Sequence, residues 1–224
     1  MNDILSSAQT SALITDRIYG IIKREIQPGQ TELSIAQHIK KLIKRFGGEK
    51  EAFRIIVASG KRSAKIHGFA SSKIIQAGDL VMMDFGVVFH GMCSDITRTF
   101  VVGKKPTKKQ KEIFKIVKKA QEIALKEVRP GACCCTVDAA AREFIASRGF
   151  GKNFPHSTGH GVGKKIHQPP KISAKNYRQL KEGDIITIEP GIYIKGWGGI
   201  RIEDLILVTK DGHKRLTRCK ISLN

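Results

Sequence analysis

Residues 80–100 read LVMMDFGVVFHGMCSDITRTF, and this stretch holds two acids inside runs of apolar and β-branched residues. Asp84 and Asp95 therefore lie where strands normally bury apolar side chains. Their midpoint falls between residues 89 and 90, next to Gly91, and a glycine there suits a tight turn. The pattern predicts a β-hairpin whose two carboxylates face each other within about one residue of register.

Residues 185–205, IITIEPGIYIKGWGGIRIEDL, repeat this arrangement further along the chain. Here the acids are Glu189 and Glu203, and their midpoint is Gly196, in a glycine-rich segment that also suits a turn. Asp204 follows Glu203 directly. Alternation along a strand places Asp204 on the opposite face, where we expect an ordinary surface acid or an arginine partner.

The two predicted hairpins belong to a longer internal repeat. Residues 11–26 and 31–46 have apolar residues at helical spacing on either side of Pro28-Gly29, and the pattern returns 102 residues later around Pro130-Gly131. The half-repeats cover about residues 11–102 and 113–209, each with helices first and strands after. This segregation predicts an α+β fold with a mostly antiparallel sheet, in a single domain over residues 1–224.

The same shift brings the acids together. It moves Asp84 and Asp95 to positions 186 and 197, three to six residues from Glu189 and Glu203. The repeat and the acid pairs therefore predict one site at a pseudo-two-fold axis. Four carboxylates in a core cannot all stay ionised without compensation, and divalent cations are the economical compensation.

A nitrogen ligand is available in the segment 154–163, FPHSTGHGVG. His156 and His160 have i, i+4 spacing, but the surrounding glycines exclude a regular helix and, with it, a helical zinc-protease motif. The glycines indicate room for backbone to approach a bound group. Four carboxylates and one histidine are too many ligands for a single catalytic zinc, and they favour two adjacent ions of Mn, Co, Fe or Zn.

Composition bounds the remaining classes of function. The 224 residues carry 40 Lys and Arg against 20 Asp and Glu, a net charge of +20, which points first to a polyanionic partner. The densest basic run, residues 104–119, lies where the two halves join. No apolar run is long enough to cross a bilayer, and nothing indicates secretion. The five cysteines show no disulfide framework, so we expect reduced thiols and a cytoplasmic protein.

Five motifs, in order, carry a resemblance to a known family: MDFG with Asp84, SDITRT with Asp95, GHGVG with His160, IEPG with Glu189 and RIED with Glu203. Over nearly the whole chain they resemble metallopeptidases of the pita-bread fold, which include methionine aminopeptidases and Xaa-Pro peptidases. The resemblance implies the pseudo-two-fold pita-bread (creatinase/aminopeptidase) fold, a curved sheet with two helix pairs outside. It also implies two divalent metal ions held by these five residues.

Details of the motifs resemble prolidases and aminopeptidase P more than methionine aminopeptidases. The resemblance implies that His67 and His167 bind and polarise the substrate. It also implies that Glu189 carries a proton from water to the leaving nitrogen. Arg201 is expected near the substrate, where it meets either a peptide carboxylate or a neighbouring acid.

The sequence departs from the Xaa-Pro peptidases at three places. Lys61-Arg62 stands where relatives often have Pro-Asn, and Gln168 stands where Glu is usual, so substrate choice is affected rather than the metal set. The chain begins shortly before the repeat, and it therefore resembles the catalytic domain alone, without the N-terminal creatinase-type domain.

These observations predict a dinuclear metallopeptidase that hydrolyses the N-terminal bond of Xaa-Pro peptides. One alternative is a methionine aminopeptidase. Another is a non-catalytic pita-bread domain that binds ribosomes or nucleic acid, which the charge favours and the complete ligand set opposes. A nucleic-acid partner is thus left open but not favoured, no membrane partner is expected, and the oligomeric state stays undecided.

Overall fold

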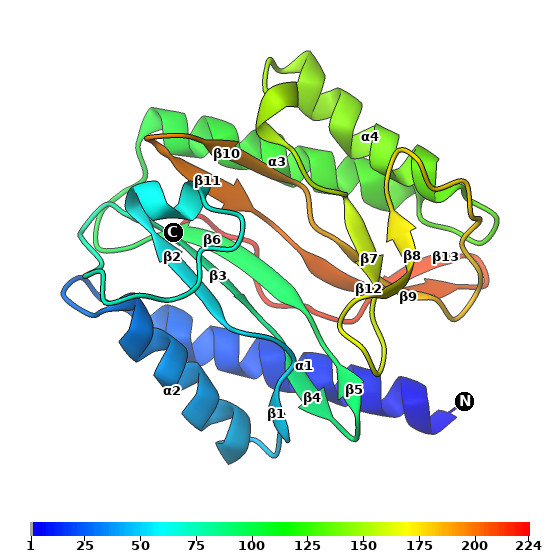
Figure 1. Ribbon diagram of the computed structural model, residues 1–224, viewed down its shortest axis with the longest axis horizontal. Coiled ribbons are helices and arrows are strands. Elements are labelled where there is room, and N and C mark those ends of the chain that lie inside the picture. Colours follow the sequence, from blue (N-terminus) through cyan, green and yellow to red (C-terminus); the bar gives the residue numbers. More distant parts are fainter. Residues whose placement is uncertain (1) are drawn as a thin grey trace.

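The computed structural model describes residues 2–224 of the chain. Two helix pairs flank the strands: Figure 1 shows α1 (Asn2–Glu25) and α2 (Glu32–Arg45) on one side, with α3 (Lys108–Glu127) and α4 (Cys134–Ser147) on the other. A shift of 102 residues carries both ends of α2 onto the ends of α4, and the last residue of α1 onto the last residue of α3. The helices therefore follow the predicted repeat.

Local sequence explains where the helices begin and which faces they bury. Thr31 caps α2 by accepting the N–H of Ser34, and Thr107 forms a reciprocal capping box with Gln110 at the start of α3. The apolar faces of α1 and α2 pack on the strands of the first half, and those of α3 and α4 pack on the second, so each half has its own core. Within residues 2–224 we find no helix with the length and apolar character that a membrane crossing requires.

All strand pairings are antiparallel, as expected. The strands of the first half are β1 (Lys50–Glu51), β2 (Ile56–Ser59), β3 (Leu80–Phe85), β4 (Val87–Phe89), β5 (Met92–Cys93) and β6 (Ile96–Val101). Those of the second half are β7 (Gly159–Gly161), β8 (Gln168–Ile172), β9 (Ile185–Ile188), β10 (Gly191–Ile194), β11 (Gly198–Arg201), β12 (Asp204–Thr209) and β13 (Gly212–Arg215). They form sheets in the orders β2-β3-β6, β1-β4-β5, β13-β12-β9-β7-β8 and β10-β11.

The first hairpin forms, but its register differs from the prediction. Asp84 pairs with Thr97 rather than lying opposite Asp95. The turn is centred between His90 and Gly91, both with positive φ (46° and 71°), so the hairpin centre lies one residue beyond the midpoint of the two acids. A two-residue turn with two positive φ angles matches the twist of the strands, which explains why this position is preferred.

The second hairpin is centred where the sequence predicts it. Ile188 pairs with Asp204, Ile192 pairs with Ile200, and both pairs are symmetric about Gly196, which has φ 81°. Glu189 lies in the short break between β9 and β10, and Glu203 lies in the matching break between β11 and β12. The two glutamates are therefore opposite each other at the middle of the hairpin.

The repeat also explains why the acids do not coincide at a shift of 102. In the first half the Gln76 N–H bonds to Asp79 Oδ2, and in the second half the Lys181 N–H bonds to Asp184 Oδ2, a separation of 105 residues. Asp84 and Glu189 share this separation of 105. The second half thus has three more residues between its helix pair and this turn.

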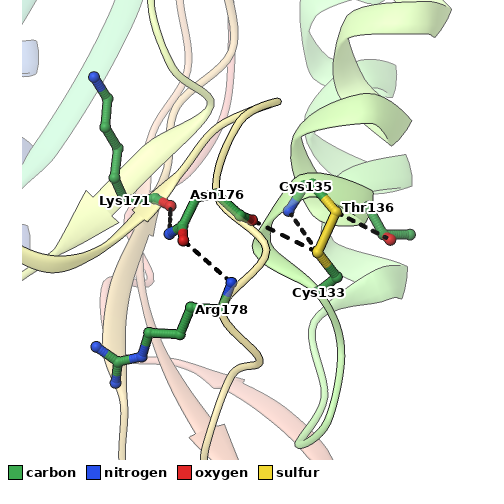
Figure 2. The surroundings of a disulfide bond; sticks show 6 residues. All are labelled: Cys133, Cys135, Thr136, Lys171, Asn176 and Arg178. Atoms are coloured by element: carbon green, nitrogen blue, oxygen red, sulfur yellow. Dashed lines mark hydrogen bonds between the residues drawn. A yellow bond between two sulfur atoms is a disulfide. The ribbon is translucent and has the colours of Figure 1, made fainter.

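A disulfide joins Cys133 and Cys135, contrary to the expectation that all five thiols are reduced. Cys133 is the N-cap of α4, and its Sγ accepts the backbone N–H of Cys135 at 3.2 Å, so the first helical turn brings the two side chains together. Figure 2 shows the bond beside Asn176 and Arg178 of the neighbouring loop. Cys93, Cys134 and Cys219 are free thiols.

Candidate metal centre

Each acid of the predicted site lies at or beside a break in a strand. Asp84 is the fifth residue of β3, and Asp95 lies between β5 and β6. Glu189 lies between β9 and β10, and Glu203 lies between β11 and β12. Because the two hairpins meet along the pseudo-two-fold axis, where Thr99 and Arg201 exchange hydrogen bonds, these breaks converge on one place.

The convergence produces a compact set of oxygen and nitrogen atoms. Asp95, His160 and Glu203 each offer a ligand atom, and these atoms all lie within 4.8 Å of one another. His160 Nε2 is 3.7 Å from Asp95 Oδ2 and 3.4 Å from Glu189 Oε1. Asp84 completes the group on the side of Arg201. The sequence-predicted ligands are therefore brought together from both halves.

Hydroxyl groups of the neighbouring strands hold two of the acids. Thr97 Oγ1 donates to Glu203 Oε2 at 2.6 Å, and Thr187 Oγ1 donates to Glu189 Oε1 at 3.1 Å. Thr187 Oγ1 also accepts the backbone N–H of His160. These bonds fix the carboxylates without supplying a positive charge.

Two carboxylate oxygens in the cluster have no protein partner. Asp84 Oδ1 and Asp95 Oδ1 are buried from solvent and accept no hydrogen bond within residues 2–224. A buried, unsatisfied carboxylate oxygen costs free energy unless a cation or donor meets it. This donor set, mostly oxygen with one imidazole, fits a divalent cation of the Mn, Co, Fe or Zn type.

The electrostatics of the cluster favour cation binding as well. Burial raises the pKa of Asp84, Asp95 and Glu203 above the ordinary value, and the neighbouring acids raise those of Asp95 and Glu203 further. Burial also raises the pKa of Glu189 to about 7. For His160, burial lowers the pKa, which favours the neutral imidazole that a metal ion requires.

The glycines around His160 have a different role from the one expected. A Cβ on Gly159 would lie 1.9 Å from the carbonyl oxygen of Thr187, and a Cβ on Gly161 would lie 2.4 Å from that of Pro169. The glycines therefore let β7 pack closely between β8 and β9. They make room for neighbouring strands rather than for a bound group.

A cavity of about 690 Å³ opens above the acids. All eight predicted site residues line it: His67, Asp84, Asp95, His160, His167, Glu189, Arg201 and Glu203. The rings of His160 and His167 are in edge contact, with centroids 4.3 Å apart, whereas His67 lies beside Phe69. His67 and His167 are both exposed and can reach a molecule in the cavity.

Arg201 is engaged by the protein rather than free for a peptide carboxylate. Its side chain is 2% exposed, and its Nη2 lies 2.5 Å from Asp84 Oδ2. Arg201 Nε and Nη1 donate to Thr97 Oγ1 and Tyr193 Oη. Of the two expectations for Arg201, the structure favours the ion pair with a neighbouring acid.

Sequence reasoning missed the contact between His156 and Tyr193. His156 Nε2 lies 2.8 Å from Tyr193 Oη, and His156 lines the cavity without joining the metal-ligand group. Burial lowers the pKa of His156 to about 3, so its ring is neutral. In the sequence, only the spacing of four residues between His156 and His160 indicated that His156 lies near the site, and nothing linked His156 to Tyr193.

Asp204 faces away from the cavity and pairs with Arg98 Nη2 at 2.6 Å, as its strand position predicted.

Comparison with known proteins places these features in a family. Residues 6–210 match the sequence profile described as metallopeptidase family M24. The chain is 48% identical over 210 residues to proteins named Xaa-Pro dipeptidase from Pyrococcus horikoshii and Pyrococcus furiosus, which covers 94% of this chain and 60% of each relative. The chain thus spans about 60% of the length of these curated relatives.

Solved structures agree with the sequence matches. The prolidase from Pyrococcus horikoshii superposes with a TM-score of 0.97 at 45% identity, over 100% of this chain and 64% of that one. An X-Pro aminopeptidase from Thermotoga maritima superposes with a TM-score of 0.96 at 38% identity, over 99% of this chain and 63% of that one. These similarities confirm the predicted pita-bread fold.

Proposed function

This chain belongs to metallopeptidase family M24, and we propose that it is a divalent-metal-dependent hydrolase of the amino-terminal bond in Xaa-Pro peptides. The observation that carries the proposal is the buried cluster of four acids and one histidine at the floor of an open cavity, with two carboxylate oxygens left unsatisfied. The names of the relatives, Xaa-Pro dipeptidase and X-Pro aminopeptidase, support the substrate class.

We assign two divalent ions to the cluster, held by Asp84, Asp95, His160, Glu189 and Glu203. The number of carboxylates supports two ions rather than one, because a single catalytic zinc takes three protein ligands. Manganese, cobalt, iron and zinc all suit this donor set. When bound, such ions supply Lewis acidity toward the scissile carbonyl and an acidified water. Since the ligands come from both halves of the chain, both halves act as one catalytic unit.

Three residues of the cavity are assigned roles toward the peptide. Glu189 carries a proton to the leaving nitrogen, because its side chain is 15% exposed toward the cavity whereas that of Asp95 is only 6% exposed. His67 and His167 lie exposed on the cavity wall and donate hydrogen bonds to the substrate carbonyl.

The cavity itself suits the end of a peptide with a small ring. Its walls carry the apolar side chains of Phe53, Ile56, Ile66, Phe69, Ile166 and Pro169. These surfaces provide contact area for a prolyl ring, and the acids at the floor attract a free α-amine. Both features support cleavage next to an amino-terminal residue.

An activity panel with metal analysis tests the proposal. The chain is stripped with a chelator, reconstituted separately with manganese, cobalt, iron and zinc, and assayed on Ala-Pro, Ala-Pro-Ala and Met-Ala-Ala. Cleavage of the Xaa-Pro peptides, dependent on added metal, is the expected result. Preferential cleavage of the Met peptide would instead indicate a methionine aminopeptidase. No cleavage of any peptide by fully metallated protein would refute an enzymatic role.

A further inference from the structure

A second cavity lies between α3 and the segment that follows β13, apart from the cavity above the acids. Its volume is about 360 Å³, near the lower end of the range for small-molecule sites. Of the described residues, none lines both cavities. The second cavity is lined by Lys118, Gln121, Glu122, Arg215, Arg218, Cys219, Lys220 and Ile221.

The lining of this second cavity is strongly basic. Among the described residues that line it, one side chain is acidic, that of Glu122, and four are cationic: Lys118, Arg215, Arg218 and Lys220. Lys118 lies 3.9 Å from Glu122, and Arg215 lies 3.5 Å from the buried Asp204. Arg218 and Lys220 are exposed and form no ion pair with any residue from 2 to 224. These two cations therefore lack a counter-charge.

Hydrogen bonds fix the backbone that carries Arg218 and Lys220. Asp16 of α1 accepts the backbone N–H groups of Arg218 and Cys219 at 2.6 and 2.9 Å. From the other half of the molecule's polar contacts, the buried Arg98 donates to the Cys219 carbonyl at 3.0 Å. Because this backbone is already ordered, an anion that binds here immobilises side chains alone, which lowers the entropic cost of binding.

Gln121 adds a hydrogen-bond acceptor to the lining. Its side chain is fully buried, and its Nε2 donates to the Ile188 carbonyl and to Asp204 Oδ2, both at 3.1 Å. Its Oε1 accepts no hydrogen bond within residues 2–224. Exchange of the amide oxygen and nitrogen would break both Nε2 bonds, so the acceptor stays without a donor. A ligand with a hydroxyl group beside its negative charge can supply that donor.

Charge and size together favour a small phosphate compound over a nucleic acid. Guanidinium and ammonium groups both bind phosphate oxygens through charge-assisted hydrogen bonds. Four cations and one acid leave a charge of +3 on the lining, more than the roughly −2 of a single phosphate group at pH 7, so two linked phosphates match it better. Single-stranded nucleic acids are bound on aromatic side chains along a groove, and no aromatic residue among those described lines this cavity.

We propose that the second cavity binds a small molecule with a diphosphate group, either inorganic diphosphate or a nucleoside diphosphate. Arg218 and Lys220 bind the phosphate oxygens, Lys118 and Arg215 add positive charge, and Gln121 Oε1 accepts a hydrogen bond from a hydroxyl group. The site is independent of the proposed peptidase function. Lys118 belongs to the basic run of residues 104–119, so part of the net charge of +20 serves this site.

Isothermal titration calorimetry with ADP, AMP, adenosine and inorganic diphosphate tests the proposal. The protein is titrated after chelation of metal, and again after manganese loading and removal of free ion. We expect ADP and diphosphate to bind at a single site, with ADP about tenfold tighter than AMP, the effect of one more charge-assisted contact. Adenosine should not bind, and the Kd of ADP should be the same with and without manganese. The ratio of the two affinities then distinguishes a nucleotide from inorganic diphosphate.

A charge-matched pair of variants separates this site from general attraction. The double variant Arg218→Ala/Lys220→Ala should raise the Kd of ADP about a hundredfold, because two charge-assisted contacts are lost. The control is Lys111→Ala/Lys115→Ala, which removes the same charge from two exposed lysines of α3 that line neither cavity. The control should keep the wild-type Kd. Since all four side chains are exposed, both variants should keep the wild-type thermal midpoint without ligand.

Four outcomes would overturn the proposal. Absence of binding by ADP and diphosphate at millimolar concentration would remove the site. Equal weakening in the two double variants would show attraction to the net charge alone. Binding confined to the manganese-loaded protein would place the ligand at the metal cluster. A short single-stranded RNA that binds more tightly than ADP, and that both double variants weaken equally, would assign the cations to a nucleic-acid surface.

Discussion

Two groups of buried carboxylates in this molecule have opposite surroundings. Glu32, Asp138 and Asp204 all have fully buried side chains, and each is paired with an arginine and with additional donors. Asp138, for example, accepts two bonds from Arg142 and two from Thr158. We call these three the anchoring acids, because they tie helices and loops to the sheet. The four acids of the proposed metal cluster, which we call the central acids, are Asp84, Asp95, Glu189 and Glu203. They are largely buried as well, but within residues 2–224 only Asp84 is paired with an arginine, and Asp84 and Asp95 each retain an unsatisfied oxygen.

Burial alone therefore does not identify a metal site. Although burial raises the pKa of Asp138, hydrogen bonds from Arg142 and Thr158 bring it below the ordinary value. At the central acids burial prevails and the pKa values are raised. Asp138 is therefore a satisfied anion without any ligand, whereas the central acids need an additional cation to stay ionised.

The largest effect expected from this comparison is at Asp95. Asp95→Asn removes a charge whose surroundings already disfavour it, so the variant should fold with an unchanged or higher thermal midpoint in the absence of metal. Substitution of groups that merely orient ligands costs 10- to 100-fold in metal affinity or activity, so loss of a ligand should cost at least about a hundredfold. Elemental analysis and kcat/KM on Ala-Pro measure both losses. Full activity with bound metal would remove Asp95 from the ligand set.

An Asp-to-Asn substitution at an anchoring acid should instead lower the free energy of unfolding and leave metal binding unchanged. Asp138→Asn leaves Arg142 without its carboxylate, and because the Arg142 side chain is 31% exposed and can be hydrated, we expect a loss of about 2 kcal/mol in the free energy of unfolding. Metal stoichiometry should stay at the wild-type value below the thermal midpoint. Urea unfolding and elemental analysis provide the two readings. Loss of metal without loss of stability would erase the distinction between the two groups.

A third test uses pH on the metal-free protein. The folded-state pKa of Glu189 is about 7, above its ordinary value of 4.5, so its contribution to stability is complete below about pH 4.5. That contribution disappears as the pH rises through 7, a change on the order of 3 kcal/mol. The chelated protein should therefore lose stability between pH 4.5 and 7.5, and Glu189→Gln should flatten this slope. With metal bound the slope should reverse, because metal binding requires deprotonated ligands.

The smallest expected effect concerns Lys23, a partly buried cation whose charged form is disfavoured by burial, as it is at the central acids. The Lys23 ammonium lies 3.6 Å from the centroid of the Phe100 ring, no ion pair is found for it among residues 2–224, and burial lowers its pKa to about 8. The residue 102 positions later is Leu125, which is buried in the second core. Lys23→Leu should raise the free energy of unfolding at pH 7 by about 1 kcal/mol, measured in urea. A decrease would show that the contact with Phe100 outweighs the cost of burial.

The gathering of the four acids at one cavity was predictable because strand pairing fixes their positions. Glu189 and Glu203 are symmetric about Gly196, and a glycine-rich turn leaves little choice of register. The predicted partner of Asp84 was wrong by two residues, because the turn is centred one residue later, where His90 adopts a positive φ that no residue type requires. The bond of His156 to Tyr193 joins residues 37 positions apart through the tertiary fold, so no local pattern contains it.

The partners of the charged side chains and of the cysteines were the features hardest to predict from the sequence. Arg201 has an acid and an open cavity within reach, and only the packed arrangement decides in favour of Asp84. Cys133 and Cys135 bond because Cys133 caps a helix whose first turn aligns their side chains, a detail that composition and spacing do not reveal. The glycines beside His160 likewise serve strand packing, which a single chain segment cannot show.

The internal repeat has a final consequence for the cluster. His160 in β7 corresponds at 102 residues to Ala58 in β2, so only one half contributes an imidazole. Two identical copies of a half could build such a centre only as a symmetric homodimer, in which both sides would carry the same donors. Covalent fusion removes that equality and lets the copies diverge. If two ions bind as proposed, the unequal donors of the two halves would give them chemically unequal positions, and we then expect stepwise loading with two distinct affinities.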